Sequence, residues 1–445
     1  MKNLTSTLKL LPALLLGMAA FPAMAQHTGI QYFRSNNKNG INQFETTKKD
    51  SVPFTGLKVN LGGNFTQDYQ ALKDHNNAQP AMNNGVDANQ LMGLTNGFNL
   101  AMANLNIDVQ LADGIRLNVT TYLSTRHHQD TWVKGGYIQF DKLPFLNNEA
   151  INKLMNHFTI KVGDFDVDYG DTHFRRTDGG NSIYNPFVEN YIMDAFATEI
   201  GGEIYYHANN GFFAMLGMTD GQLNPTVTAS TNIDAATGRM NHYDPAFHGK
   251  LGFDKQLNQD LRVRLTGSFY TDKSSSSNTL YWGDRTGSHY FFVMENTAAT
   301  SDGNAWSGRL NPLFSEQVNS YMVNPFLKYK GLEFFGTYEI AKGRTINETD
   351  MRKATQLAAD LVYRFPANKE NFWIGARYNT VEAALPGYLS NINIDRVVGS
   401  AGWFLTKNVM LKAEYVSQLY HNFPTTDIRS GGKFNGLMVE ASVGF

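Results

Sequence analysis

The sequence predicts an all-β protein, a transmembrane antiparallel β-barrel of about sixteen strands. Three observations predict this fold class. Apolar and polar residues alternate with a period of two in many segments, which is typical of strands that have one apolar face. Very short connections alternate with long polar ones, as in outer-membrane barrels. The chain ends on an aromatic residue, Phe445, which closes the last alternating segment.

The composition agrees with a membrane barrel and excludes several function classes. Charged residues make up 18% of the chain, below the roughly 25% of an average soluble domain, and aromatic residues make up 13%. The formal net charge of -2 gives no reason to expect a nucleic-acid partner. Because the 445 residues include no Cys, disulfides, thiolate metal sites and Cys nucleophiles are excluded.

Residues 1–25 have the pattern of a secretory signal peptide. Two lysines precede an apolar stretch over residues 10–20, and a small-x-small site ends at Ala25, so cleavage is expected before Gln26. The apolar stretch is shorter than the about 20 residues of a membrane-spanning helix. Together with the predicted barrel, export of this kind predicts the outer membrane of a Gram-negative bacterium as the location.

The mature chain then divides into two parts. Residues 26–53 are polar and lack alternation, so they form either a tail or a plug inside the barrel lumen. Residues 54–445 form the barrel itself. Its clearest strand is the last one, where Leu437, Val439, Ala441 and Val443 share one parity and Glu440 lies in the other. The predicted strands are residues 57–67, 98–111, 115–125, 132–141, 157–167, 196–207, 212–220, 246–254, 261–271, 319–329, 332–342, 354–365, 371–381, 392–404, 409–420 and 433–445.

Two features leave the strand count and the strand ends open. Residues 272–318 are interpreted as one long outer loop, but the apolar patch at 290–294 could begin another hairpin and give eighteen strands. Aromatic residues near strand ends suggest interfacial girdles, although aromatic residues favour strands in any case. These residues are Trp132, Trp373, Trp403, Tyr415, Tyr420 and Phe445.

The stretch from Gly163 to Asp171, continuing through Arg175-Arg176 to Asn185-Pro186-Phe187, resembles a Bacteroidota-type outer-membrane porin of the broad group that includes the phosphate-selective porins. The resemblance in architecture covers nearly all of residues 54–445. It implies passive diffusion of small hydrophilic or anionic solutes, a homotrimer, and contact with outer-membrane lipid and lipopolysaccharide. Phosphate-selective members use an arginine ladder and a lysine cluster in the lumen, and this sequence has no compact ladder.

Charged residues of the polar parity are expected to line the lumen, because Arg or Lys facing lipid costs about 2–4 kcal/mol near the bilayer midplane. Eleven basic and nine acidic positions result, which predicts a mixed wall with a weak anion preference. Pairing between neighbouring strands is the alternative, purely structural role. The wall candidates include Arg116, Arg262, Arg264, Arg377, Lys412 and Glu414.

The long connection 168–195 is the candidate constriction loop. Folded into the barrel, it would place Arg175 and Arg176 against Asp164, Asp166 and Asp168. A β-bulge at Gly163 would turn these aspartates inward. The alternative is that the strand has left the membrane there and that the aspartates are solvated.

No cofactor, metal or catalytic residue is expected. The spacing of Asp164, Asp166 and Asp168 is similar to the start of a calcium loop, but Tyr169 replaces the required Gly and position twelve is Arg175. No hydrolase, zinc-protease or phosphate-loop motif is present. The first prediction is therefore a porin. The alternatives are a substrate-specific transporter similar to the fatty-acid channels, with an N-terminal hatch, and a structural or adhesion barrel.

Overall fold

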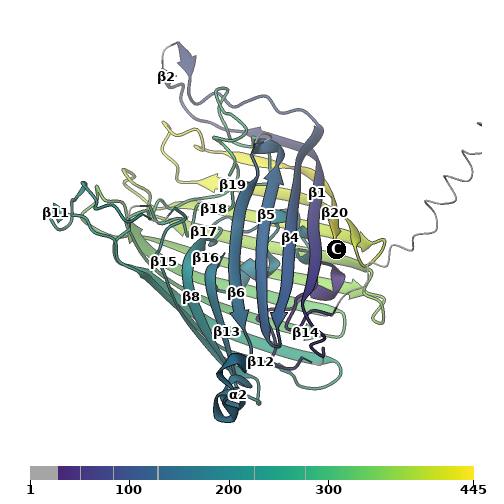
Figure 1. Cartoon of the computed structure of the whole chain (residues 1–445). Helices are drawn as coiled ribbons and strands as arrows, with labels where there is room; N and C mark the ends of the chain where they lie inside the picture. The colour runs from purple at the N-terminus through teal and green to yellow at the C-terminus, as the bar shows by residue number, and fades with distance from the viewer. Residues whose placement is uncertain (1–28, 51, 84, 128–129, 225, 276) are drawn as a thin grey trace, which may run out of the picture.

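The computed structural model describes residues 29–50, 52–83, 85–127, 130–224, 226–275 and 277–445. The expected signal peptide at 1–25 lies outside the described residues. Sixteen antiparallel strands form one closed barrel, and β1 pairs with β20 to complete it. Figure 1 shows this closing pair side by side, in purple and yellow. The sixteen-strand prediction is confirmed, and the eighteen-strand alternative is wrong.

The barrel strands match the predicted segments closely. They are β1 (Lys58–His75), β4 (Gly97–Ala112), β5 (Ile115–Ser124), β6 (Trp132–Phe140), β7 (Phe158–Asp166), β8 (Thr198–His207), β9 (Phe212–Thr219), β12 (Ala246–Gln256), β13 (Leu261–Asp272), β14 (Gln317–Tyr329), β15 (Leu332–Arg344), β16 (Arg352–Phe365), β17 (Phe372–Ala383), β18 (Ile392–Phe404), β19 (Val409–His421) and β20 (Lys433–Gly444).

Short elements lie in the connections. Two small hairpins, β2 (Met82–Asn83) with β3 (Val86–Asp87) and β10 (Ile233–Asp234) with β11 (Arg239–Met240), belong to the long loops. Figure 1 shows them at the end of the barrel opposite α2. No helix in the described ranges is long and apolar enough to cross a membrane. The helical turns are η1 (Lys38–Gly40), η2 (Thr125–His127), η3 (Pro144–Leu146), α2 (Glu149–Met155), η4 (Thr172–Arg175) and η5 (Asp178–Tyr184).

The alternation of each strand places apolar side chains on the outside, as a lipid-facing surface requires. In β20, Leu437 is 43% exposed whereas its neighbour Met438 and the charged Glu440 are buried inside. Strand β1 continues well beyond the expected residue 67. Its extension turns Asp68 and Gln70 inward and is polar because those side chains meet inward-folded loops.

The aromatic residues expected in a girdle lie on the outer face only in part. Near the short-turn end, the outer face carries a stacked row, Tyr363–Phe365–Phe372–Trp403, with ring centroids 5.7 to 6.0 Å apart. Trp373 and Tyr420, which we expected in a girdle, are buried instead. Both have the inward parity of their strands and pack in the lumen, where the loops supply an apolar environment.

The bulge expected at Gly163 lies one strand away. Gly163 pairs in continuous register with Tyr137 and Gly201, and its φ of +139° suits only glycine. The register shift occurs between β5 and β6, where Lys134 is the extra residue. Beyond this bulge β6 and β7 stop pairing, since their last partners are Gly136 and Asp164.

Substitution of Gly402 tests the close packing inside the barrel. A Cβ at Gly402 would lie 2.0 Å from the indole of Trp373, which is 1% exposed, whereas a Cβ at Gly399 on the same strand meets nothing within 4 Å. We expect Gly402→Ala to destabilise the barrel by about 1–3 kcal/mol, because overpacking displaces the ring. Urea unfolding in lipid vesicles measures this, and Gly399→Ala is the control. Equal stabilities for the two variants would contradict the packing described here.

Candidate functional site

The connection between β7 and β8 crosses the lumen and binds the opposite wall. Its backbone amides donate to inward side chains of three strands: Val188 to Glu414 of β19 (2.7 Å), Ile192 to Asn379 of β17 (2.7 Å) and Met193 to Gln356 of β16 (3.0 Å). Lys412 of β19 donates to three loop carbonyls, with the shortest bond, 2.7 Å, to Phe187. This constriction loop is therefore held by wall side chains that bind main-chain groups.

The two arginines of the constriction loop have different partners from those we expected. Arg176 pairs with Asp194 at 2.7 Å and approaches Asp284 at 3.7 Å. Arg175 is 6% exposed, and its guanidinium lies 4.7 Å from the ring centre of Phe335. The three guanidinium nitrogens of Arg175 have no hydrogen-bond partner among the described residues.

The three aspartates lie elsewhere. Asp168 binds Lys250 and lies 3.3 Å from His173, whereas Asp164 and Asp166 line a cavity beside β4–β7. The predicted contacts between the arginines and these aspartates are absent from the described residues, because the loop carries both arginines away from the cavity wall that the aspartates line. Burial and the Lys250 ammonium lower the pKa of His173 to about 3, so His173 is neutral at physiological pH.

The long connection 273–316 also folds into the lumen. Tyr290, fully buried, donates to Glu414 at 2.6 Å, and Gln70 of β1 donates to the Phe291 carbonyl at 2.8 Å. Arg396 of β18 donates to the Gly308 carbonyl at 2.8 Å. The apolar patch at 290–294 resembled a strand in the sequence because it packs inside the barrel, against Phe434 among others.

The two inward loops are joined to each other through Glu189. Its carboxylate binds Arg309 at 2.6 Å and accepts from the Ser288 hydroxyl at 2.9 Å and the His289 amide at 2.6 Å. Burial alone would favour the neutral acid, but Arg309 and the other cations around it lower the pKa of Glu189 to about 2. The contact is therefore ionic over the whole physiological range.

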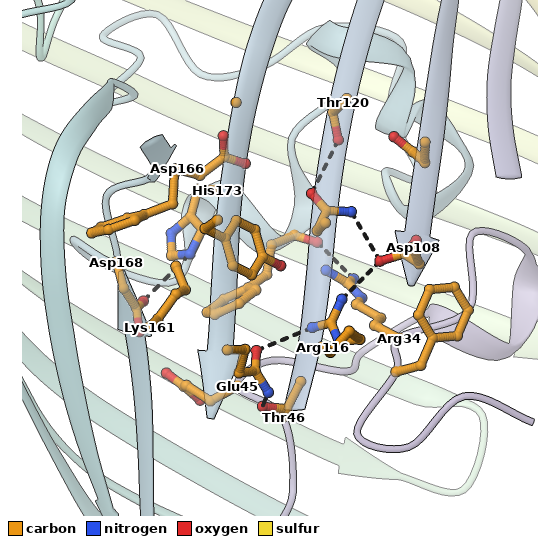
Figure 2. Close-up of a pocket in the computed structure, with 18 of the residues that line it drawn as sticks. Arg34, Glu45, Thr46, Asp108, Arg116, Thr120, Lys161, Asp166, Asp168 and His173 are labelled. Carbon is orange, nitrogen blue, oxygen red and sulfur yellow. Dashed lines mark hydrogen bonds and ion pairs between the residues drawn. The ribbon is translucent and has the colours of Figure 1, made fainter. Parts of the chain in front are cut away.

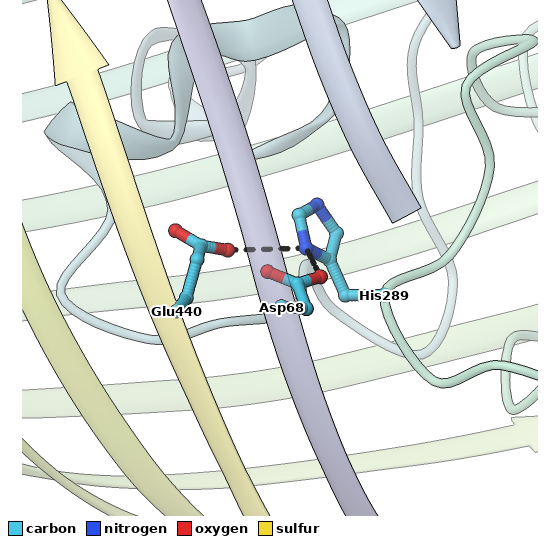
Figure 3. Close-up of side chains that lie close together, drawn as sticks. All are labelled: Asp68, His289 and Glu440. Carbon is cyan, nitrogen blue, oxygen red and sulfur yellow. Dashed lines mark hydrogen bonds and ion pairs between the residues drawn. The ribbon is translucent and has the colours of Figure 1, made fainter. Parts of the chain in front are cut away.

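One group of three side chains has the arrangement of metal ligands. In the part of the chain that the structure describes, only Asp68, His289 and Glu440 bring three ligand atoms within 4.8 Å of one another. Figure 3 shows both carboxylates joined to the ring of His289, whose Nδ1 lies 2.7 Å from Asp68 and 3.1 Å from Glu440.

The charges around this triad favour a protonated histidine over a metal ion. Lys412 also binds Glu440, at 2.9 Å, so Lys412 and an imidazolium neutralise both carboxylates, whereas a divalent cation with neutral histidine leaves an excess positive charge. Burial opposes the imidazolium, but Asp68 and Glu440 raise the pKa of His289 well above its usual value. The triad therefore fastens loop 273–316 to the seam between β1 and β20.

The N-terminal segment, residues 29–57, spans the mouth of the barrel at the short-turn end. Lys48 binds Asp141 after β6 (2.9 Å), and Glu45 binds Arg264 of β13 (2.7 Å). Further along the rim, Lys38 donates to Asn371 beside β17 (2.6 Å). These contacts hold the segment across the opening.

The predicted wall residues face the lumen, and most of their charges are neutralised by oppositely charged side chains. Each of the five basic residues has an acidic partner: Arg116 with Asp108 (2.8 Å), Arg262 with Asp254 (2.7 Å), Arg264 with Asp171 (2.8 Å), Arg377 with Asp360 (2.7 Å) and Lys412 with Glu440 (2.9 Å). The sixth candidate, Glu414, accepts bonds from both inward loops. The wall charges are therefore committed to structural pairs.

Three of the cavities among the described residues form a row: two lie beside β4–β8, and the third lies between the N-terminal segment and strands β12 and β13. The middle cavity, of about 240 Å³, is lined by β4–β7, the constriction loop and the N-terminal segment, and Figure 2 shows Arg116 and Asp108 on its wall. The outer cavity, of about 620 Å³, shares Lys134 and Asp164 with it. A third, of about 410 Å³ at the short-turn end, shares Phe44 and Glu45 of the N-terminal segment.

Sequence reasoning missed two residues that organise the lumen, Lys134 and His289. Nothing in the sequence distinguished Lys134 from the other charged residues. Its position in the lumen follows from the β-bulge in β6, which the alternation did not reveal. His289 was not singled out either. The signal that could have found it is the inward parity of Asp68 and Glu440, since these carboxylates pair directly across the closing strands and require a cation.

The fold and lumen define a sixteen-stranded transmembrane barrel with two inward loops. No family model and no curated protein matches the chain. Among solved structures, OprB of Pseudomonas putida at high pH has a TM-score of 0.52 and 10% identity, covering 88% of this chain and 94% of that one. An anion-selective porin from Comamonas acidovorans scores 0.48 at 10% identity, covering 87% and 100%. The outer membrane channel DcaP of Acinetobacter baumannii scores 0.48 at 12% identity, covering 88% and 98%. At 10% identity, the similarity to OprB supports the fold of this chain and nothing beyond it.

Adjacent arginines provide a test of the constriction loop. Arg176→Met breaks a buried ion pair and should destabilise the barrel by about 3 kcal/mol, whereas Arg175→Met removes an unpaired buried charge and should be neutral or stabilising. Urea unfolding followed by tryptophan fluorescence compares the two. A loss of stability in Arg175→Met as large as that in Arg176→Met would mean that Arg175 is bound by a group the description above does not include.

The Glu189 contact predicts a specific pH dependence. A carboxyl group whose pKa is lowered by folding stabilises the folded state above its unfolded pKa, and this contribution is lost as the pH falls through the folded pKa. The two loops should therefore stay joined from about pH 8 down to about pH 4 and separate as the pH approaches about 2. Amide hydrogen exchange of residues 188–193 at several pH values reports this. A rise in exchange centred near pH 6 would show that another group controls the contact.

Proposed function

We propose that the chain is a porin of the outer membrane of a Gram-negative bacterium and that small hydrophilic solutes diffuse through it. The observation that carries this proposal is the row of three cavities with shared lining residues, which runs from the outer loops along β4–β8 and ends between the N-terminal segment and strands β12 and β13. Solutes would follow this off-centre path, because the inward loops fill the other side of the lumen. The surroundings would be outer-membrane lipid and lipopolysaccharide, and the assembly a homotrimer, as the resemblance to porins implies.

The charges along the path argue for little ion preference. The middle cavity is lined by four cationic side chains and five carboxylates: Arg34, Arg116, Lys134, Lys161, Glu45, Asp108, Asp164, Asp166 and Asp168. The anion preference predicted from the whole wall has no support in this lining. Asp164, Asp166 and Asp168 remain constriction candidates because they line the path, whereas Arg175 and Arg176 would act only by holding the constriction loop.

A second candidate function rests on the N-terminal segment. Its contacts with wall and rim residues are those that the hatch of a substrate-specific transporter would need. In that case the path would be closed at rest and would open only when the segment is displaced. The two functions therefore differ in whether the unmodified protein conducts.

Single-channel conductance of the refolded chain in planar bilayers tests both. We expect stable open steps, with a reversal potential near zero in a KCl gradient. We also expect Lys48→Met to raise the conductance or the open fraction, since it breaks the contact with Asp141. Lys153→Met is the matched control, because it removes the same charge from an exposed residue of α2 that lines none of the three cavities and has no ion-pair partner in the described ranges.

The outcomes separate the candidates. Conductance in the unmodified chain supports the porin. Conductance that appears only in Lys48→Met supports the hatch. A correctly folded barrel that conducts in neither form would reject both proposals and favour a structural or adhesion role.

A further inference from the structure

The outer cavity gathers most of the tryptophan in the chain. Three of the five tryptophans, Trp132, Trp282 and Trp306, line its volume of about 620 Å³. We propose that this cavity, which we name the outer vestibule, is a binding site for a saccharide. The inference builds on the proposed function, because it assigns a substrate class to the outer end of the diffusion path.

The position of the vestibule follows from the barrel wall. Strands β6 and β7 stop pairing above Gly136 and Asp164, because Lys134 bulges out of register. The vestibule lies at this break, with Trp132 and Lys134 of β6 on one side and Thr198 of β8 on the other. Residues 222–224 and loop 273–316 complete its lining. A solute that enters from the loop end therefore meets the vestibule before the middle cavity.

The aromatic side chains offer faces for the C–H groups of a sugar ring. Trp282 and Trp306 lie 6.3 Å apart at 75°, so their ring faces are nearly perpendicular, and Trp282 is 42% exposed. The face of an aromatic ring carries partial negative charge and attracts partly positive hydrogens. Trp132 is already covered on one face by Arg285, at 3.8 Å. The free packing surface is therefore supplied by the two loop tryptophans.

Polar side chains in the lining of the vestibule have unused hydrogen-bonding capacity. Among the described residues, the buried Nε1 of Trp132 and the buried Oγ1 of Thr279 have no hydrogen-bond partner, and Asp164 has no ion-pair partner. These groups provide a donor, a hydroxyl and a carboxylate acceptor. A sugar hydroxyl both donates and accepts, so a saccharide whose ring packs on tryptophan matches the mixed polarity of this lining.

Other ligand classes fit the lining less well. An acyl chain needs aliphatic walls, but the aliphatic side chains here are only Val133, Ala197 and Leu223. A strongly charged ligand needs a lining in which charges of the opposite sign are in excess. This lining instead mixes Lys134 and Arg285 with three aspartates. The Asp284 carboxylate already interacts with two cations of the protein. Burial raises its pKa, but the charges of Lys134 and Arg176 outweigh burial and lower the pKa below its usual value. The volume is ordinary for a small-ligand site, roughly 300–1,000 Å³.

Tryptophan fluorescence of the full chain tests the site without depending on conductance. The chain is refolded into phosphatidylcholine vesicles without lipopolysaccharide and titrated with maltotriose, cellotriose and chitotriose. We expect a saturable change with at least one of the three, and an affinity at least tenfold weaker in Trp282→Ala and in Trp306→Ala. Trp403→Phe is the matched control, because Trp403 lies on the outer face of β18, stacked on Phe372.

The vesicle composition and the ligand distinguish the source of the sugar. If lipopolysaccharide added to the vesicles competes with the trisaccharide, the vestibule binds lipid-linked saccharide; if it does not, the ligand is a free solute. No saturable change with any trisaccharide would overturn the inference, as would equal weakening in Trp403→Phe. Saturation by lauric acid alone would replace it with an acyl-chain site.

Failure of this inference can be distinguished from failure of the proposed function. Conductance without saccharide binding would reject the vestibule site and keep the porin. Binding without conductance would keep the site and reject passive diffusion. Heat-dependent migration in gels shows whether each variant has folded. If either Trp282→Ala or Trp306→Ala does not fold, the other variant alone provides the test.

Discussion

A closed barrel in lipid must neutralise its charges on the inside, and the rest of this structure depends on that constraint. Alternation turns each apolar residue of a strand toward lipid and its charged neighbour toward the lumen. A buried charge without a partner is costly. Some wall charges pair with the next strand, as Arg377 does with Asp360. Others, such as Lys250 and Lys412, bind groups of the constriction loop. The wall therefore determines where the loops lie.

The seam of the barrel illustrates the same constraint. Asp68 of β1 and Glu440 of β20 are direct partners where the first and last strands meet. Two like charges directly opposite each other destabilise a strand pair. His289 supplies the missing positive charge from loop 273–316, more than 140 residues before the end of the chain. Closure of the barrel and the folding of this loop are therefore linked, and the loop is part of the wall's own stability rather than an added lid.

Alternation predicted the strands well because it is a local property that lipid enforces at every second residue. It gave all sixteen barrel strands, and β1 was too short only because Asp68 and Gln70 made its extension look like a loop. Alternation shows on which side of the sheet a side chain lies, but it does not show which residue that side chain contacts. Arg175 and Arg176 were assigned to aspartates close in sequence, whereas Arg176 binds Asp194 and Asp284 after the loop has crossed the lumen. Trp373 was misplaced for a related reason: an apolar lumen exists only where loops fill it.

The off-centre position of the middle and outer cavities follows from unequal strand lengths. Strands β14 to β19 have 12 to 14 residues, and their inward side chains hold the two loops. Strands β6 to β9 have only 8 to 10. Short strands present fewer inward side chains, so less loop is bound on that side and space remains. The bulge at Lys134 ends the β6–β7 pairing early on the same side and leaves the gap in which the tryptophans gather. One asymmetry of the wall thus places both the middle cavity and the outer vestibule beside the short strands.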